Sequence, residues 1–175
     1  MRTVTAQPTL VRDAMAADLP ALVAIKGLGT DAVHRDRLKL AESDGFRYLV
    51  LAGRRTLLGF ACLVARRPTA WSDADDTGHL PQIIDLQVHP AQRGRGYGSA
   101  FLRTIARIVA EAGYSELYVS VEPRDNPRAF ALYQRLGYQA LQKAPYLKRW
   151  TFIDSAGNAH RGANWVVDMV TDLRR

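Results

Sequence analysis

Cysteine is nearly absent from this sequence: Cys62 is the single one among 175 residues. A lone cysteine cannot form an internal disulfide, and Cys62 has no cysteine or histidine near it at a metal-ligand spacing. The four histidines are scattered and form no i, i+4 pair, so we expect no metal site. Cys62 lies in an apolar run and is expected to be a small buried hydrophobe rather than a nucleophile.

Long apolar runs are missing as well. No run approaches the roughly 18 residues that a membrane-spanning helix needs. The first fifteen residues lack the basic patch and apolar core of a secretory signal. We therefore expect a cytoplasmic protein without a membrane partner. With 47% hydrophobic and 23% charged residues, the chain suits one globular domain over residues 1–175.

The charge is unbalanced: 24 lysines and arginines stand against 17 acids, which gives a net charge of +7. An excess of this kind points to an anionic partner, such as nucleic acid, a membrane surface or a phosphorylated small molecule. The alternative is that the basic balance only keeps the protein soluble. The positions of the charges must decide between these readings.

Apolar spacing, caps and turn residues predict the order of helices and strands. Asp18 is expected to cap a first helix that ends near Gly27 or Gly29, and residues 31–43 are interpreted as a surface helix. Further helices are expected up to Gly113 and Gly137. Strands are expected over 48–52, 57–65, 83–88, 117–121, 138–142, 150–153 and 165–170, with a long exposed loop over 66–81. This order predicts an α/β fold, a mixed sheet with helices on its faces.

The chemically most informative segment is a strand, a glycine-rich turn and a helix. The turn reads Arg93-Gly94-Arg95-Gly96-Tyr97-Gly98. Glycines before a helix allow backbone N–H groups to approach an anion at the positive end of the helix dipole. The sequence has no GxxxxGK[ST] motif, and Ser99 stands where the dinucleotide fingerprint GxGxxG needs its third glycine. Both of those nucleotide-binding classes are therefore excluded.

Two motifs together resemble a known family. Arg93-x-x-Gly96-x-Gly98, directly after a strand that ends in Leu86-Gln87-Val88, resembles the acetyl-CoA motif of the GCN5-related N-acetyltransferase (GNAT) superfamily. The segment from Asn126-Pro127 to Gly137-Tyr138 resembles the second signature of that family. The resemblance covers roughly residues 82–140. It implies one GNAT-like domain: a mixed, mainly antiparallel sheet flanked by helices, with a central splayed strand pair.

The resemblance also implies an activity. Acetyl-CoA would be the cosubstrate, without a metal, and its acetyl group would pass directly to a primary amine of a small molecule, peptide or protein. Homodimers are common among relatives, so a homodimer is a further expectation. One alternative keeps the fold without the reaction, as an acyl-CoA-binding sensor. Another is a nucleic-acid binder, but the strand-turn-helix context argues against it, and we expect no nucleic-acid partner.

Roles follow for individual residues. Backbone amides of the turn would hold the CoA pyrophosphate; these belong to Arg93, Gly94, Arg95, Gly96, Gly98 and Ser99. The backbone of Leu86 and Val88 would pair with the pantetheine arm, and the Val88 amide would face the thioester oxygen.

Two further residues are expected on the helix that opens at Asn126-Pro127. Asn126 and Tyr133 lie seven residues apart, on one helix face, and would meet the sulfur end of the cofactor. Tyr133 would protonate the leaving thiolate. The alternatives are that Tyr133 is only part of an apolar stripe and that Asn126 is only a helix cap.

The general base departs from the family pattern. Many relatives carry a glutamate on the fourth or fifth strand, but the matching positions here are Gln82, Ile84 and Ser120. Asp85 is the best remaining candidate, because a carboxylate inside an apolar strand must be paired or must lie in a cleft. It could instead anchor a cationic substrate. Glu122 and a chain of water molecules are the other candidates.

The acceptor site is less defined by the sequence. Trp71 and the loop acids Asp73, Asp75 and Asp76 could attract a cationic amine, or form only a solvated loop. The aromatic residues Tyr146, Trp150 and Trp165 could line an acceptor pocket or fill the core.

Overall fold

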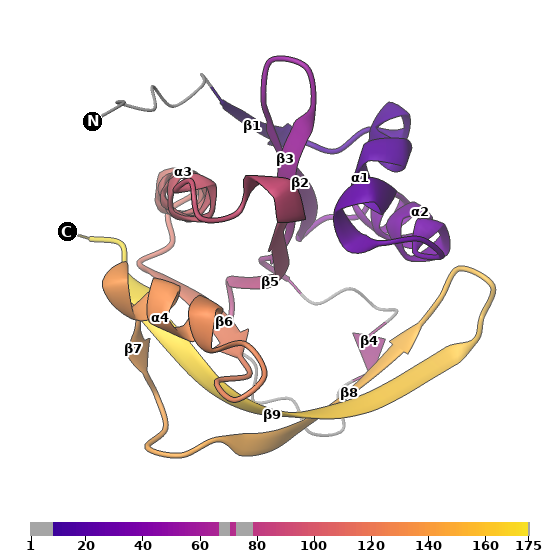
Figure 1. The fold of residues 1–175 in the computed structure, drawn as a ribbon. Helices are drawn as coiled ribbons and strands as arrows, with labels where there is room; N and C mark the ends of the chain where they lie inside the picture. The colour runs from indigo at the N-terminus through magenta and orange to yellow at the C-terminus, as the bar shows by residue number, and fades with distance from the viewer. Residues whose placement is uncertain (1–8, 67–70, 73–78, 175) are drawn as a thin grey trace.

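The computed structural model describes residues 9–66, 71–72 and 79–174. Within them, nine strands form a sheet in the order β1-β2-β3-β5-β6-β9-β8-β4, with β7 beside β9 (Figure 1). Among the described residues every strand pair is antiparallel except β5 with β6. The predicted mixed, mainly antiparallel sheet is therefore confirmed. No helix of the described residues is long and apolar enough to cross a membrane.

The elements have the following bounds. The helices are η1 (Ala16–Asp18), α1 (Leu19–Lys26), α2 (Asp31–Leu40), η2 (Pro90–Gln92), α3 (Tyr97–Glu111) and α4 (Pro127–Arg135). The strands are β1 (Leu10–Asp13), β2 (Phe46–Ala52), β3 (Leu57–Val64), β4 (Trp71–Ser72), β5 (Gln82–Val88), β6 (Glu116–Val121), β7 (Gln139–Ala140), β8 (Tyr146–Ile153) and β9 (Ala159–Asp172). Asp73, Asp75 and Asp76, expected near an acceptor, lie outside the described residues.

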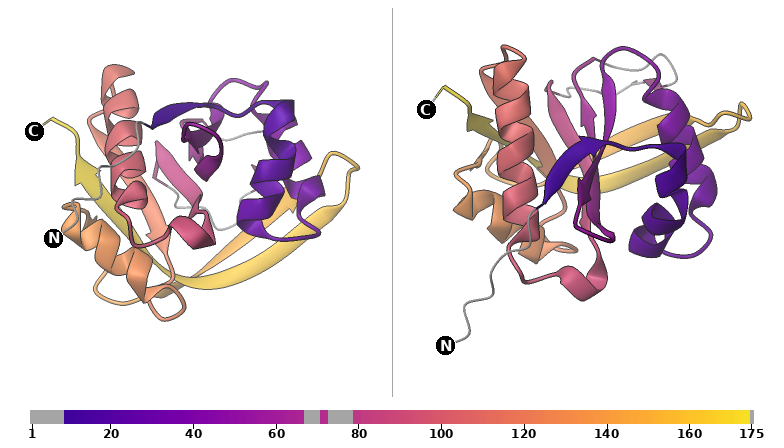
Figure 2. Two further views of the ribbon diagram at one scale, coloured as in Figure 1. Left: turned by 45° about the horizontal axis from the view of Figure 1, so that its top comes forward. Right: turned by 90° about the horizontal axis from the view of Figure 1, so that it is seen from above.

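Helices cover both faces of the sheet, as Figure 2 shows. One core cluster packs β-strand residues against α3 and α4, and a second packs β2 and β3 against α1 and α2. Because both faces are covered, β3 is buried at every position, and a continuous apolar run forms a central strand. Cys62 on β3 is fully buried, and burial raises the pKa of its thiol to about 12. The prediction of a buried hydrophobe is confirmed.

The central strands β5 and β6 separate soon after they meet. They pair in parallel only through Gln82 with Tyr118 and Ile83 with Val119. Beyond these pairs β5 has a bulge against β3, where Asp85 adopts a positive φ of 47°. Gly59 on β3 permits this path, because a Cβ atom there would lie 2.5 Å from the Gln87 carbonyl oxygen. The expected splayed strand pair is confirmed.

The N-terminal third differs from the sequence-based predictions. Strand β1 was not predicted, because four residues carry too little pattern. Helix α2 lies at the surface as predicted, but its inner face was not predicted: His34 is fully buried and the Arg37 side chain is only 18% exposed. Asp18 occupies the cap position of α1 but makes no capping hydrogen bond there. Its carboxylate instead accepts hydrogen bonds from Arg12 and from the Met15 amide.

The C-terminal hairpin is confirmed but is longer than expected. Strands β8 and β9 pair from Tyr146 with Val166 to Ile153 with Ala159, around the predicted turn. The hairpin of β8 and β9 crosses the lower part of the view in Figure 1 and extends toward α2. There the Ser155 hydroxyl donates a hydrogen bond to Asp36. Trp150 and Trp165 are 45% and 59% exposed, so neither fills the core.

Candidate active site

A cavity of about 1020 Å³ opens where β5 and β6 part. Its walls are the end of β5, the glycine-rich turn before α3, the end of β6 and the first turns of α4. It brings together all but one of the predicted site residues: Asp85, Leu86, Val88, Arg93, Gly94, Gly96, Gly98, Ser99, Asn126 and Tyr133. The exception, Arg95, lines a neighbouring hollow. Residues that are up to 48 positions apart in the sequence thus share one space.

The glycine-rich turn fits an anion. Gly94 and Gly96 have positive φ values of 76° and 83°, and no atom lies within 4 Å of a Cβ built on either. Gly96 begins α3, whose first hydrogen bond runs from the Ala100 amide to the Gly96 carbonyl at 3.0 Å. The N–H groups of the first turn consequently lack partners within the helix. They offer the donors and the positive dipole end that a pyrophosphate requires.

The end of β5 offers a second set of backbone donors. The His89 amide donates to the Leu58 carbonyl on β3 at 2.8 Å. Successive N–H groups of a strand point to opposite edges, so the Val88 N–H points away from β3, toward the cavity. The Val88 carbonyl accepts a hydrogen bond from Arg93 Nε at 3.1 Å, which ties the turn to the strand end. The Val88 N–H is therefore placed to meet a negatively charged oxygen.

Tyr133 lies on the α4 wall of the cavity. It is 7% exposed, packs in the core at 5.5 Å between ring centroids from Tyr138, and also lines the cavity. Burial raises the pKa of its phenol to about 12, so the group stays protonated at neutral pH. Its hydroxyl makes no hydrogen bond to any residue that the structure describes. Tyr133 therefore has a proton available for donation.

Asn126 stands at the start of the same helix. It occupies the cap position of α4, but its side chain makes no capping hydrogen bond. It lines the cavity instead. The amide group is thus free to meet a ligand.

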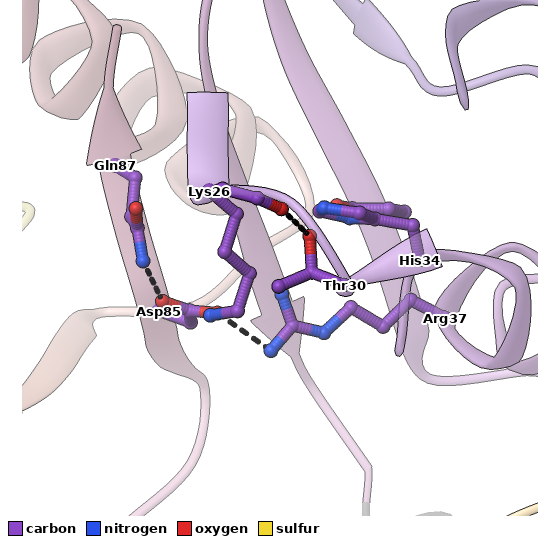
Figure 3. Close-up of polar contacts among 8 residues, drawn as sticks. Lys26, Thr30, His34, Arg37, Asp85 and Gln87 are labelled. Atoms are coloured by element: carbon purple, nitrogen blue, oxygen red, sulfur yellow. Dashed lines mark hydrogen bonds and ion pairs between the residues drawn. The ribbon is translucent and has the colours of Figure 1, made fainter. Parts of the chain in front are cut away.

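Asp85 lies at the other end of the cavity, held by two cations (Figure 3). Its Oδ2 is 2.6 Å from both Lys26 Nζ and Arg37 Nη2, and its Oδ1 accepts a hydrogen bond from Gln87 at 2.8 Å. Burial raises the pKa of the Asp85 carboxyl, but the charges of Arg37 and Lys26 outweigh it and hold the pKa below its ordinary value. A carboxylate with these partners is a weak base.

Lys26 and Arg37 were missed by the sequence reasoning. They come from the last turns of α1 and α2, and both pack over Phe60 at about the same distance, 5.9 and 5.8 Å to the ring centroid. The partners of Asp85 lie far from it in the sequence, and no local spacing reveals such pairs. The two helices are thereby fixed to the bulge of β5.

A second polar cluster, also missed, lies behind β6. Asp168 on β9 is only 3% exposed, and it accepts hydrogen bonds from the Ser120 and Tyr146 hydroxyls. Gln82 and Lys148 in turn donate to the Ser120 oxygen at 2.7 and 3.2 Å. The signal was present: Asp168 is a lone carboxylate within an apolar strand, the pattern that singled out Asp85. Ser120 lines the cavity, so this cluster forms part of its floor.

Comparisons with known proteins agree with this geometry. A model of the acetyltransferase (GNAT) family matches residues 15–138. A mycothiol acetyltransferase from Rhodococcus jostii (strain RHA1) is 34% identical over 110 residues, which is 62% of this chain and 31% of that protein. The chain thus spans about a third of the length of that relative.

Solved structures share the fold. An N-acetyltransferase from Staphylococcus aureus Mu50 superposes with a TM-score of 0.65 at 17% identity, over 96% of this chain and all of that one. A ribosomal-protein-alanine N-acetyltransferase from Brucella melitensis gives 0.64 at 21% identity, with 93% and 99% covered. An acetyltransferase-fold protein from Salmonella typhimurium, solved with its cofactor acetyl-CoA, gives 0.63 at 19% identity, with 97% and 96% covered.

The cavity between parting strands, the glycine-rich turn and the matched model define the class of the protein. The chain belongs to the acetyltransferase (GNAT) family. The predicted family is confirmed.

Proposed function

We propose that this chain transfers the acetyl group of acetyl-CoA directly to a primary amine of a small molecule, a peptide or a protein. The observation that carries the proposal is the single cavity that joins the glycine-rich turn of α3, the free edge of β5 and the Tyr133 hydroxyl. An anion site, a strand edge and a proton donor correspond to the three parts of CoA: a pyrophosphate, an amide-containing arm and a sulfur.

The residues fit acetyl-CoA on local observations. The open space at Gly94 and Gly96 lets phosphate oxygens approach the backbone closely. On the edge that faces β6, β5 has no strand partner beyond Ile83 among the described residues. The backbone of this edge can therefore bond to the amides of the pantetheine arm. Asn126 adds an uncommitted amide near the sulfur end.

The reaction needs few groups from the protein. Bound acetyl-CoA supplies a thioester, whose carbonyl carbon is the electrophile. The Val88 N–H stabilises the negative charge that develops on the carbonyl oxygen as an amine attacks. Tyr133 donates its proton to the departing thiolate, as the C–S bond breaks. The cavity holds amine and thioester together, which lowers the entropic part of the barrier.

Asp85 takes a different role in this proposal from that of a general base. Its ion pairs with Lys26 and Arg37 fix α1 and α2 against β5, so it positions the wall on which an acceptor would lie. The amine loses its proton to Glu122, which also lines the cavity, or to water.

The acceptor is an amine in keeping with the relatives, whose names include a mycothiol acetyltransferase and a ribosomal-protein-alanine N-acetyltransferase. The test begins with calorimetric titration of acetyl-CoA at physiological salt. Saturable one-to-one binding is expected, followed by thiol release with at least one member of a panel of amino sugars, polyamines, amino acids and peptides. Absence of acetyl-CoA binding would overturn the proposal, and binding without turnover on any amine would favour an acyl-CoA sensor.

A further inference from the structure

A second hollow, of about 490 Å³, adjoins the cavity. Gln92 and Tyr97 line both spaces, so the two are neighbours at the glycine-rich turn. The remaining polar lining is Thr56 and three arginines: Arg54 and Arg55 from the turn between β2 and β3, and Arg95. We refer to this space as the arginine hollow.

The three arginines of the hollow carry uncompensated charge. None of them makes a hydrogen bond or an ion pair with a residue that the structure describes. No acidic residue is among those that line the hollow. Elsewhere on the surface Arg47 and Arg66 each lie 2.8 Å from a carboxylate. Three unneutralised guanidinium groups repel one another, and a bound anion would relieve that repulsion.

The type of anion follows from the chemistry of the hollow. Guanidinium groups from two separate turns can bind a phosphate monoester through paired N–H donors. Leu58 and the Tyr97 ring are the apolar members of the lining, and the other five lining residues are polar. The hollow therefore suits a compact, highly charged group rather than an extended apolar one.

We propose that Arg54, Arg55 and Arg95 bind the 3′-phosphate on the ribose of CoA. The inference rests on the proposed use of acetyl-CoA. With the pyrophosphate on the glycine-rich turn, an adenosine directed past Gln92 and Tyr97, which line both spaces, would bring the ribose phosphate, the next anionic group of the molecule, to the hollow. The hollow gives that group its counter-charges, and so selects CoA over analogues that lack it.

Calorimetric titration tests the assignment with a matched pair of ligands, acetyl-CoA and acetyl-3′-dephospho-CoA. The wild-type protein should bind the dephosphorylated ligand roughly 10-fold or more weakly. In the Arg54→Ala/Arg55→Ala variant, acetyl-CoA should bind about as weakly as the dephosphorylated ligand does, so the discrimination disappears.

A second double variant controls for position. Arg128 and Arg135 also line the large cavity, and Arg128→Ala/Arg135→Ala removes the same charge from its other wall. This variant should keep the wild-type discrimination. If instead it loses the discrimination, or if the Arg54→Ala/Arg55→Ala variant keeps it, the phosphate is bound elsewhere and the assignment is wrong.

The two proposals fail differently. Equal wild-type affinity for both ligands overturns the role of the arginine hollow and leaves the proposed function intact. If neither ligand binds, the proposed function itself fails. A thermal melt of each variant shows that it is folded before it is titrated.

Discussion

Lys26 Nζ lies 2.6 Å from Oδ2 of Asp85, so the end of α1 is tied to the bulge of β5 across 59 positions of sequence. The side chains are 23% and 22% exposed, so the pair is mostly removed from water. Removal of its carboxylate would leave two cations, Lys26 and Arg37, facing each other without compensation.

Asp85→Asn should therefore lower the free energy of unfolding by about 2–3 kcal/mol. Urea denaturation at pH 7 measures this change in the free energy of unfolding. Asp13→Asn is the matched control, because Asp13 pairs with Arg47 at 2.8 Å on the exposed surface. Its effect should stay within about 0.5 kcal/mol. A kcat reduced about 100-fold, with unchanged stability, would instead make Asp85 the general base.

Tyr133→Phe tests the proton donor. Loss of the hydroxyl should reduce kcat by about 10²-fold or more, because the thiolate then leaves unprotonated, while affinity for acetyl-CoA stays near wild type. Steady-state kinetics and calorimetry separate the two quantities. Because burial raises the pKa of the Tyr133 phenol to about 12, its ionisation should cause no decrease of the wild-type kcat below about pH 10.

Tyr138→Phe is the control for this variant. Its hydroxyl is also buried and has no hydrogen-bond partner among the described residues, and its ring packs against Tyr133. Removal of that hydroxyl should leave kcat unchanged. An equal loss of kcat in both variants would mean that packing of the ring pair, not proton donation, sets the rate.

The parts of the site that the sequence could predict are those held within one short segment. The glycine-rich turn, Asn126 and Tyr133 belong to strand-turn-helix units, in which sequence spacing dictates spatial spacing. The partners of Asp85 and Asp168 are set by tertiary packing: Ser120 meets Asp168 across 48 positions. The hydrophobic periodicity of a segment does not predict contacts between residues so distant in the sequence.

The charged face of α2 shows the same limit. Its sequence, DAVHRDRLKL, indicates a surface helix by composition. Yet His34 is fully buried and Arg37 is mostly removed from water, because Tyr48 shares a hydrogen bond of 2.6 Å with the imidazole and Asp85 compensates the guanidinium. Polar residues can occupy a core when a partner arrives from another element, which a single segment cannot reveal.

Gly96→Glu tests the anion site. A side chain at this positive-φ position adds bulk and a negative charge where the pyrophosphate would lie, so acetyl-CoA binding should be lost. Gly113→Glu is the matched control: Gly113 ends the same helix, has a φ of +92°, and likewise has no atom within 4 Å of a built Cβ. Both substitutions should cost about 1–2 kcal/mol of strain. Normal titration by the Gly96 variant would exclude the turn as the anion site.

His34 makes the stability of the protein depend on pH. Burial, together with the charges of Arg37 and Lys26, lowers the pKa of its imidazole to about 4 from an ordinary 6.5. Between these values the unfolded chain binds a proton that the folded protein does not. Stability is therefore fully present above pH 6.5 and falls as the pH drops toward 4, by up to about 3 kcal/mol in total.

Urea denaturation at pH 7.0 and 4.5 measures this loss, and His34→Gln should largely abolish it, because glutamine does not titrate. His160→Gln removes an exposed histidine that pairs with Asp154 at 2.8 Å, and should leave the loss unchanged. Asp85 cannot mimic the effect: its pKa in the folded protein is lowered, so its contribution is present above the unfolded value of about 3.9 and is lost only at more acidic pH. If the pH dependence persists in His34→Gln, the buried imidazole is not its source.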